Sequence, residues 1–157
     1  MAIFRRIGRD QEKAGEVMKV GAWNFPEELL YDDHHQWLKR EGNKITIGLS
    51  DYGQYTRGDI LYLSLPTLGT QLKAGEAVGS LETGKWVGRF YAPQTGEICA
   101  VNAEVQENSR LINEDPYGRG WLFKIKTASS DMQSLMTADQ LKSWLELELE
   151  REATCDV

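Results

Sequence analysis

Short segments in which hydrophobic and polar residues alternate dominate the middle of the chain. Every second residue is hydrophobic over 45–49, 61–65 and 121–125. Because successive side chains of a β-strand point to opposite faces, this period of two predicts strands with one buried face. Turn segments separate the strands at Glu41-Gly42-Asn43, Pro66–Gly69, Ala74-Gly75, Pro93–Gly96 and Asp115–Gly118. Turns this closely spaced predict a mainly β domain, a flattened, two-halved barrel or sandwich.

Helical patterns are confined to the two ends of this region. Asn24 is a cap residue followed by Pro26 and two acids, which predicts one short helical turn ending near Leu30. Towards the C-terminus, Thr137–Gln140 has the form of a capping box. Hydrophobic residues follow it at helical spacing, namely Leu141, Trp144, Leu145 and Leu149. This pattern predicts a C-terminal α-helix that packs its Trp144 face on the barrel.

These patterns divide the chain into three parts. We expect an N-terminal extension over 1–24, a barrel over 25–128 and a C-terminal helical segment over 129–157 that packs on the barrel. The extension is polar, with only scattered apolar residues. We therefore expect it to be at best partly ordered, and removable up to Ala22 without unfolding the barrel.

Composition and charge exclude several kinds of partner. The 18 basic and 24 acidic residues give a net charge of −6, and no stripe of Lys and Arg follows a predicted element, which argues against nucleic acid. No apolar run could span a membrane or serve as a secretory signal, so we expect a cytoplasmic protein. His34 and His35 lack partners at metal-ligand spacing, and Cys99 and Cys155 lie too far apart to indicate a zinc site or disulfide framework.

The segment around Lys85 is the strongest candidate for chemistry. Two strand-like runs, Ala77–Leu81 and Trp86–Tyr91, flank a short polar stretch in which Gly84 can adopt positive φ without a Cβ clash. This arrangement predicts Lys85 at the tip of a hairpin, where a modifying enzyme can reach its amine. The residues alone leave open that Lys85 is an ordinary surface lysine on a turn.

Many short motifs in a fixed order add to this interpretation. They are Tyr31…His35-Gln36-Trp37, Ile47–Tyr52, Gly58-Asp59-Ile60 with Leu65-Pro66 and Gly69, Lys73–Glu76, Tyr91-Ala92-Pro93 with Gly96-Glu97, Val101-Asn102, Leu111–Gly118 and Gly120-Trp121-Leu122. Over about residues 25–150 the chain resembles the H proteins of the glycine cleavage system, which are lipoyl carriers. The resemblance implies a barrel of the lipoyl/biotinyl-carrier type. It also implies a cofactor-bearing substrate of other enzymes rather than an enzyme.

The family motif E-S-V-K-A falls on Glu82-Thr83-Gly84-Lys85-Trp86. The resemblance therefore implies lipoate in amide linkage to Lys85, with Glu82, Gly84 and Trp86 completing the attachment site. It implies a lipoate ligase or a lipoyl/octanoyl transferase as the modifying enzyme, and dihydrolipoamide dehydrogenase as a partner. Biotin carriers place methionine on both sides of their lysine, whereas Gly84 and Trp86 stand here, so a biotin carrier fits less well.

Two departures from the family pattern remove negative charge. Arg89 replaces the acid of E-S-V-K-A-V-S-D, and Gln36 replaces the second acid of Y-T-x-E-H-E-W, which covers 31–37. In H proteins the lipoyl arm carries a cationic aminomethyl group, so an arginine near the arm would repel that cargo and favour an anionic one. We assign Arg89, His34, His35 and Gln36 to the surroundings of the arm and its cargo. The alternative is that Arg89 is simply a solvated strand residue.

The segment Glu82–Gly88 is similar to the lipoate-binding proteins of bacterial sulfur oxidation, which are associated with a heterodisulfide-reductase-like complex. Our main hypothesis is therefore a carrier that shuttles sulfur-bound intermediates between the enzymes of sulfur oxidation. The first alternative is a glycine cleavage H protein, which carries the aminomethyl group between the glycine decarboxylase components. The second is an unmodified structural or regulatory paralogue, because Trp86 replaces a small residue where a ligase must approach. Trp86 itself either lies along the arm or packs on a neighbouring strand.

Overall fold

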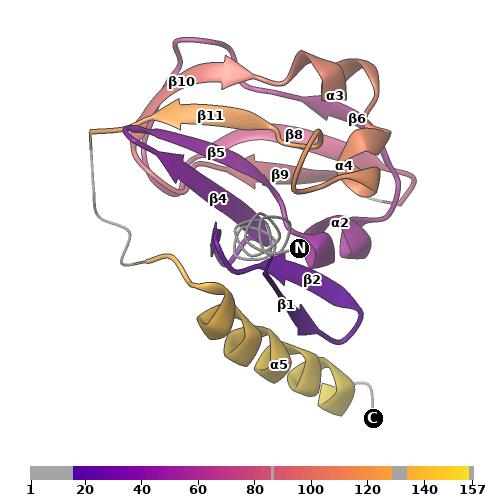
Figure 1. The fold of residues 1–157 in the computed structure, drawn as a ribbon. Helices are drawn as coiled ribbons and strands as arrows, with labels where there is room; N and C mark the ends of the chain where they lie inside the picture. Colours follow the sequence, from indigo (N-terminus) through magenta and orange to yellow (C-terminus); the bar gives the residue numbers. More distant parts are fainter. Residues whose placement is uncertain (1–15, 86, 129–133, 156–157) are drawn as a thin grey trace, which may run out of the picture.

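The structure is a computed structural model that describes residues 16–85, 87–128 and 134–155, with side chains described as far as Arg151 (Figure 1). In chain order the elements are β1 (Val17–Val20), β2 (Trp23–Pro26), β3 (Leu30–Tyr31), β4 (Gln36–Glu41), β5 (Lys44–Leu49), α2 (Asp51–Arg57), β6 (Ile60–Ser64), β7 (Gln71–Leu72), β8 (Ala77–Thr83), β9 (Val87–Tyr91), β10 (Gly96–Val101), α3 (Ala103–Glu107), α4 (Arg110–Glu114), β11 (Phe123–Lys126) and α5 (Ala138–Cys155).

The described strands form antiparallel sheets, and the two larger sheets pack around a common core. A six-stranded sheet has the order β3-β4-β5-β11-β10-β7, a three-stranded sheet has the order β6-β8-β9, and β1 pairs with β2. Ile47 and Phe123 of the larger sheet share one buried cluster with Leu81 and Phe90 of the smaller one. The mainly β, sandwich-like fold is therefore confirmed.

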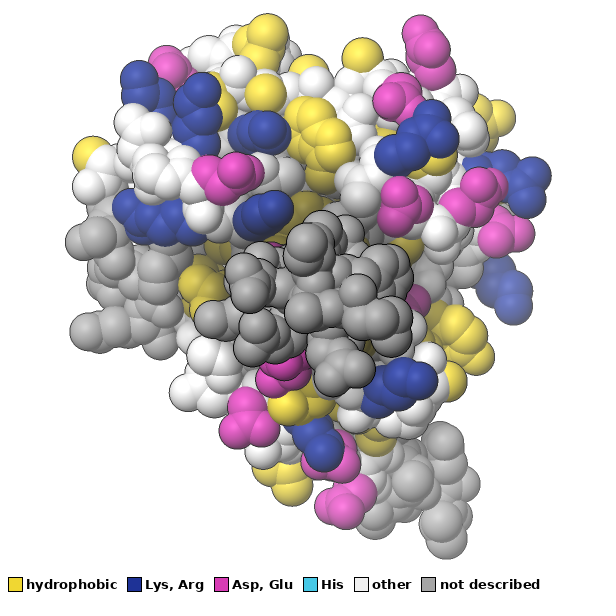
Figure 2. All heavy atoms as spheres, viewed as in Figure 1, with side chains coloured by type: hydrophobic (Ala, Val, Ile, Leu, Met, Phe, Trp, Pro, Cys, Tyr) yellow, Lys and Arg dark blue, Asp and Glu magenta, His cyan; other side chains and the backbone are white. Residues whose placement is uncertain are grey.

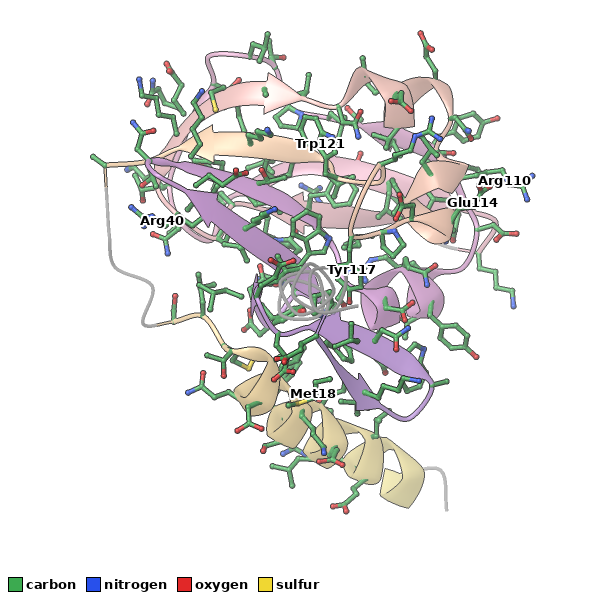
Figure 3. The ribbon with its side chains drawn as sticks, viewed as in Figure 1. Met18, Arg40, Arg110, Glu114, Tyr117 and Trp121 are labelled. Atoms are coloured by element: carbon green, nitrogen blue, oxygen red, sulfur yellow. The ribbon has the colours of Figure 1, made fainter. Side chains whose placement is uncertain are left out.

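A second core lies between the β1–β2 hairpin and α5, below the two larger sheets in Figure 1. Val20 and Phe25 of the hairpin are buried in it together with Leu141 and Leu145 of α5. Met18 of β1 points toward this helix (Figure 3). The expectation of a weakly ordered extension is therefore wrong for residues 17–24, which form an ordered hairpin, whereas residues 1–15 lie outside the described part.

A turn follows β2, and a capping box begins the C-terminal helix α5. The sequence predicts a helical turn that begins at Asn24, but Asn24 and Pro26 lie in β2. Residues 27–29 form only a turn, in which the Leu29 N–H donates to the Pro26 carbonyl at 3.4 Å. The capping box of α5 is present: the Thr137 N–H donates to Gln140 Oε1 at 2.9 Å, and the Gln140 N–H donates to Thr137 Oγ1 at 3.2 Å. Trp144 is half-buried in the second core.

The surface carries both signs of charge. Lys44 lies directly opposite Lys126 on neighbouring strands, and Glu41 and Glu97 pair with them on the two outer sides. Basic and acidic side chains are likewise interspersed over the visible face (Figure 2).

Among the described helices, none is long and apolar enough to cross a membrane.

Candidate functional site

Lys85 lies at the tip of the hairpin formed by β8 and β9. Among the described residues, the last pair of β8 with β9 before the tip is Glu82 with Val87, and the Lys85 side chain is exposed. Its backbone N–H donates to Thr83 Oγ1 at 3.3 Å. The structure therefore presents the lysine as the sequence pattern predicts, while Trp86 lies outside the described residues.

The reason expected for Gly84 is wrong. Its φ lies outside the positive region that favours glycine, and apart from its two chain neighbours no described residue has a heavy atom within 4 Å of a Cβ built on it. The turn at this position therefore does not require glycine for its backbone. What Gly84 does contribute is open space beside Lys85.

The stem below the tip is anchored in the main core. Leu81 and Phe90 point inward and are completely buried, each stabilising the fold by about 1.5–3 kcal/mol relative to an exposed position. Glu82, Val87 and Arg89 project from the opposite, exposed face. An exposed tip on a firmly packed stem fixes where the lysine leaves the barrel and leaves its amine free to move.

Gln36 fastens the far end of β9 to the turn before β4. Its side-chain NH2 donates to the Tyr91 carbonyl at 2.9 Å and to Asp32 Oδ2 at 2.7 Å, and its Oε1 accepts from the Tyr91 N–H at 2.9 Å. Burial raises the pKa of Asp32, while hydrogen bonds from Gln36 and His34 oppose that shift. Gln36 is 1% exposed, so it holds the strand from inside. The interpretation of Gln36 as a residue facing the cargo is therefore replaced by a structural one.

The two histidines occupy different surroundings. The His34 ring stacks on the Tyr91 ring, with ring centroids 4.1 Å apart. The backbone carbonyl of His34 accepts a hydrogen bond from Arg57 Nη2 at 3.4 Å. His35 faces the second core, with its ring 5.0 Å from that of Tyr52 and 5.4 Å from that of Trp144. Burial, reinforced by the nearby Arg57 charge, lowers the pKa of His35 to about 4. His34 therefore lies at the end of β9, whereas His35 belongs to the packing of α5.

Arg89 stands on the outer face of β9. It pairs with Ser80 of β8, and the alternation of the strand puts it on the same face as Val87 and Tyr91. Its side chain is exposed. Arg89 thus lies between the Lys85 tip and the Tyr91–His34 stack, along one face of the edge strand.

Comparison with known proteins adds a decisive observation. The profile of the glycine cleavage H-protein family matches residues 29–148. The glycine cleavage system H protein of Bacteroides thetaiotaomicron is 40% identical over 121 residues, covering 76% of this chain and 96% of that protein. The glycine cleavage system H protein of Halalkalibacterium halodurans is 38% identical over 123 residues, covering 78% of this chain and 96% of that protein. The chain belongs to the glycine cleavage H-protein family.

A solved family structure agrees with this assignment. The glycine cleavage system H protein of Mycobacterium marinum superposes with a TM-score of 0.72 at 27% identity, covering 78% of this chain and 99% of that one. H proteins carry lipoate covalently attached to a lysine.

The β1–β2 hairpin precedes the segment that the family profile matches. Among the described residues, no group of His, Cys, Asp and Glu is arranged to hold a metal ion.

Proposed function

We propose that this chain is the lipoyl carrier of a glycine cleavage system, with lipoate in amide linkage to Nζ of Lys85. The observation that carries the proposal is an exposed lysine at the tip of the β8–β9 hairpin in a chain of this family. Glu82 stands three residues earlier on the exposed face of β8. The relatives named above support the glycine cleavage role over sulfur oxidation.

Other lysines are less suited to carry the group. The Lys124 ammonium lies over the Trp121 ring, 5.2 Å from its centroid, within the six-stranded sheet. Lys73 precedes a tight turn in which its N–H donates to Glu76 Oε2 at 2.8 Å. Lys85 combines a packed stem with open space beside the tip, which suits a group that must reach several partners.

When attached, lipoate supplies a five-membered disulfide ring that cannot reach the dihedral of about 90° that an unstrained disulfide prefers, and is therefore open to attack. The chain itself holds Cα of Lys85 at a fixed place on the barrel surface. Partner enzymes supply the catalytic groups, so we expect no turnover from the carrier alone. The partners in this role are the enzyme that attaches the cofactor, the glycine decarboxylase components and dihydrolipoamide dehydrogenase.

Reconstitution tests the proposal. Lipoylated chain is added to purified glycine decarboxylase, and glycine-dependent release of CO2 is measured. We expect release that rises with carrier concentration and is absent with Lys85→Arg, which keeps the charge at the tip but offers no acylatable amine. Equal release with the Lys85→Arg variant would contradict the proposal.

A second candidate function rests on the charges near the hairpin. Arg89, on the exposed outer face of β9, stands where the family pattern has an acid. An exposed charge of this kind contributes about 1 kcal/mol at most to the interaction with a charged cargo, which corresponds to a severalfold change in rate or affinity. This candidate is transfer of an anionic, sulfur-bound cargo to and from a heterodisulfide-reductase-like complex.

Reversing the charge distinguishes the two candidates. Arg89→Asp is compared with Arg110→Asp, which makes the same change at an exposed position of α4. The sulfur-oxidation candidate predicts severalfold better glycine-dependent CO2 release for Arg89→Asp only, and weaker transfer with sulfur-oxidation partners. Efficient glycine-dependent release by the wild type, unchanged in Arg89→Asp, would exclude this second candidate.

A further inference from the structure

A β-bulge in β6 exposes two large side chains near the hairpin. Alternation over 61–65 predicts Leu61 inside and Tyr62 outside. The structure instead pairs Ile60 with Thr83 and Tyr62 with Glu82, which leaves Leu61 as the extra residue. As a result Leu61 is 52% exposed and Tyr62 is 68% exposed, side by side in sequence, while Ile60 is fully buried. Bulges commonly occur next to functional sites, where they redirect side chains.

The exposed residues form a surface that leads to the lysine. Tyr62, Glu82 and Val87 lie in one row across β6, β8 and β9, because Glu82 pairs with both of the other two. Val87 is 67% exposed. We call Leu61, Tyr62 and Val87 the Tyr62 patch. Glu82 stands inside it as a carboxylate between apolar neighbours. Of the rows that the structure describes across all three strands, this row is nearest to the tip that bears Lys85.

We propose that the Tyr62 patch is the docking surface for the enzyme that acylates Lys85, a partner with an apolar contact surface and a basic side chain opposite Glu82. This inference rests on the proposed function of Lys85. An extended lysine brings Nζ only roughly 6 Å from its Cα, and neighbouring strands are about 4.8 Å apart. A catalytic centre that reaches Nζ must therefore cover the last row of the hairpin. Enzymes that act on the far end of the lipoyl arm have no such requirement.

The step performed there is acyl transfer. Neutral Nζ of Lys85 attacks the carbonyl carbon of an activated lipoyl group, an acyl adenylate. The amide C–N bond forms, the bond between that carbon and the phosphate oxygen breaks, AMP leaves, and Nζ loses a proton to solvent or to a base of the enzyme. No electrons are gained or lost overall. The Tyr62 patch takes no part in the chemistry and determines how tightly the carrier is held.

The test measures initial rates of lipoyl transfer to the full chain by a purified bacterial lipoate–protein ligase, with lipoate and ATP and with carrier concentration varied. The variants are Tyr62→Thr and the double variant Leu61→Thr/Tyr62→Thr, because Thr keeps a high β propensity. The matched control is Leu68→Thr, which alters an equally exposed leucine beyond the other end of β6. Acetylation of Lys85 by a small N-hydroxysuccinimide ester, followed by peptide mapping, reports whether the hairpin and its lysine remain intact.

We expect the patch variants to raise KM for the carrier about tenfold, as loss of an interface aromatic does, with kcat within about twofold. The Leu68→Thr variant and the rate of chemical acetylation should match wild type. Wild type acylated at Lys85, with patch variants equal to it in KM, would overturn the docking inference and leave the proposed function standing. An equal KM increase in Leu68→Thr would also overturn the docking inference. Wild type with no acylation at Lys85 would overturn the proposed function itself.

Discussion

Gln36 and Tyr91 are joined by a pair of hydrogen bonds between a side-chain amide and a backbone peptide. The amide donates to the Tyr91 carbonyl and accepts from the Tyr91 N–H, both at 2.9 Å, and a further donation reaches Asp32 Oδ2 at 2.7 Å. Only a group with two donors and an acceptor satisfies all three contacts. The internal polar network therefore accounts for glutamine where the family pattern has an acid.

Gln36→Glu is expected to destabilise the fold. A carboxylate would turn two donated hydrogen bonds into contacts between acceptors, and would bury a charge beside Asp32. We expect a loss of about 2–4 kcal/mol in the free energy of unfolding, measured by urea denaturation at neutral pH. The control is Gln140→Glu, which keeps the capping-box pattern of α5 and should be neutral within about 0.5 kcal/mol. Equal stability of the two variants would contradict this view of Gln36.

Phe25→Ala is expected to lower stability although Phe25 lies before the segment matched by the family profile. Its side chain is 1% exposed and is packed in the second core. Truncation of such a residue costs about 3–5 kcal/mol, which thermal denaturation would show as a large fall in Tm. Val17→Ala, at a 41% exposed position on the same hairpin, provides the comparison and should change Tm little. A small effect of Phe25→Ala would show that the packing of the hairpin in the second core contributes little to stability.

Stability is expected to fall as the pH is lowered from 6.5 to 4, through His35. The unfolded chain binds a proton at His35 with a pKa near 6.5, whereas burial and Arg57 lower the folded pKa to about 4. In this window the unfolded state holds more protons, so stability rises with pH and is complete above 6.5. The contribution is at most about 3 kcal/mol. Asp33 opposes the shift, and Asp32, whose pKa is raised, makes an opposite contribution that is lost as the pH rises above the ordinary pKa of 3.8.

The His35→Asn variant isolates this effect. His35 has a φ of 63°, and asparagine tolerates that region better than most residues. Unfolding free energies measured between pH 4 and 7 should therefore depend less steeply on pH in the variant than in wild type. An unchanged pH dependence would show that His35 is not the group responsible.

Substitution by alanine is expected to have very different effects at Gly48 and at Gly84. A Cβ on Gly48 would lie 2.5 Å from Nε1 of Trp37, the indole that donates to the Pro116 carbonyl at 2.8 Å. We expect Gly48→Ala to cost about 1–3 kcal/mol because the indole must shift in a packed core. Gly84→Ala meets no described atom within 4 Å and should be neutral within about 0.5 kcal/mol. Chemical denaturation of both variants tests the comparison, and a larger loss for Gly84→Ala would reverse it.

The alternating pattern predicts much of the barrel because each strand is recognisable from its own residues. The run at 45–49 falls in β5, the run at 121–125 overlaps β11, which begins at Phe123, and the polar stretch around Lys85 falls at the β8–β9 tip. These features depend on side-chain alternation and on turns, which are local properties. The exposed lysine was predictable for the same reason.

The features that the sequence does not reveal depend on distant partners. The β1–β2 hairpin has strands of only four residues each, and its core partners come from α5 at the other end of the chain. Gln36 reaches Tyr91, which is 55 residues away in sequence. The bulge at Leu61 breaks the alternation without any glycine or proline in β6 to mark it. The alternation of hydrophobic residues alone therefore cannot show which face of the sheet Leu61 occupies.

The most direct test of the central claim is the intact mass of the chain after co-expression with a lipoate ligase in lipoate-fed cells, followed by peptide mapping. The account predicts one lipoyl group per chain, carried entirely by the peptide that contains Lys85, and none on the Lys85→Arg variant. Lipoate on another lysine such as Lys73 or Lys124, or modification that persists in Lys85→Arg, would contradict it.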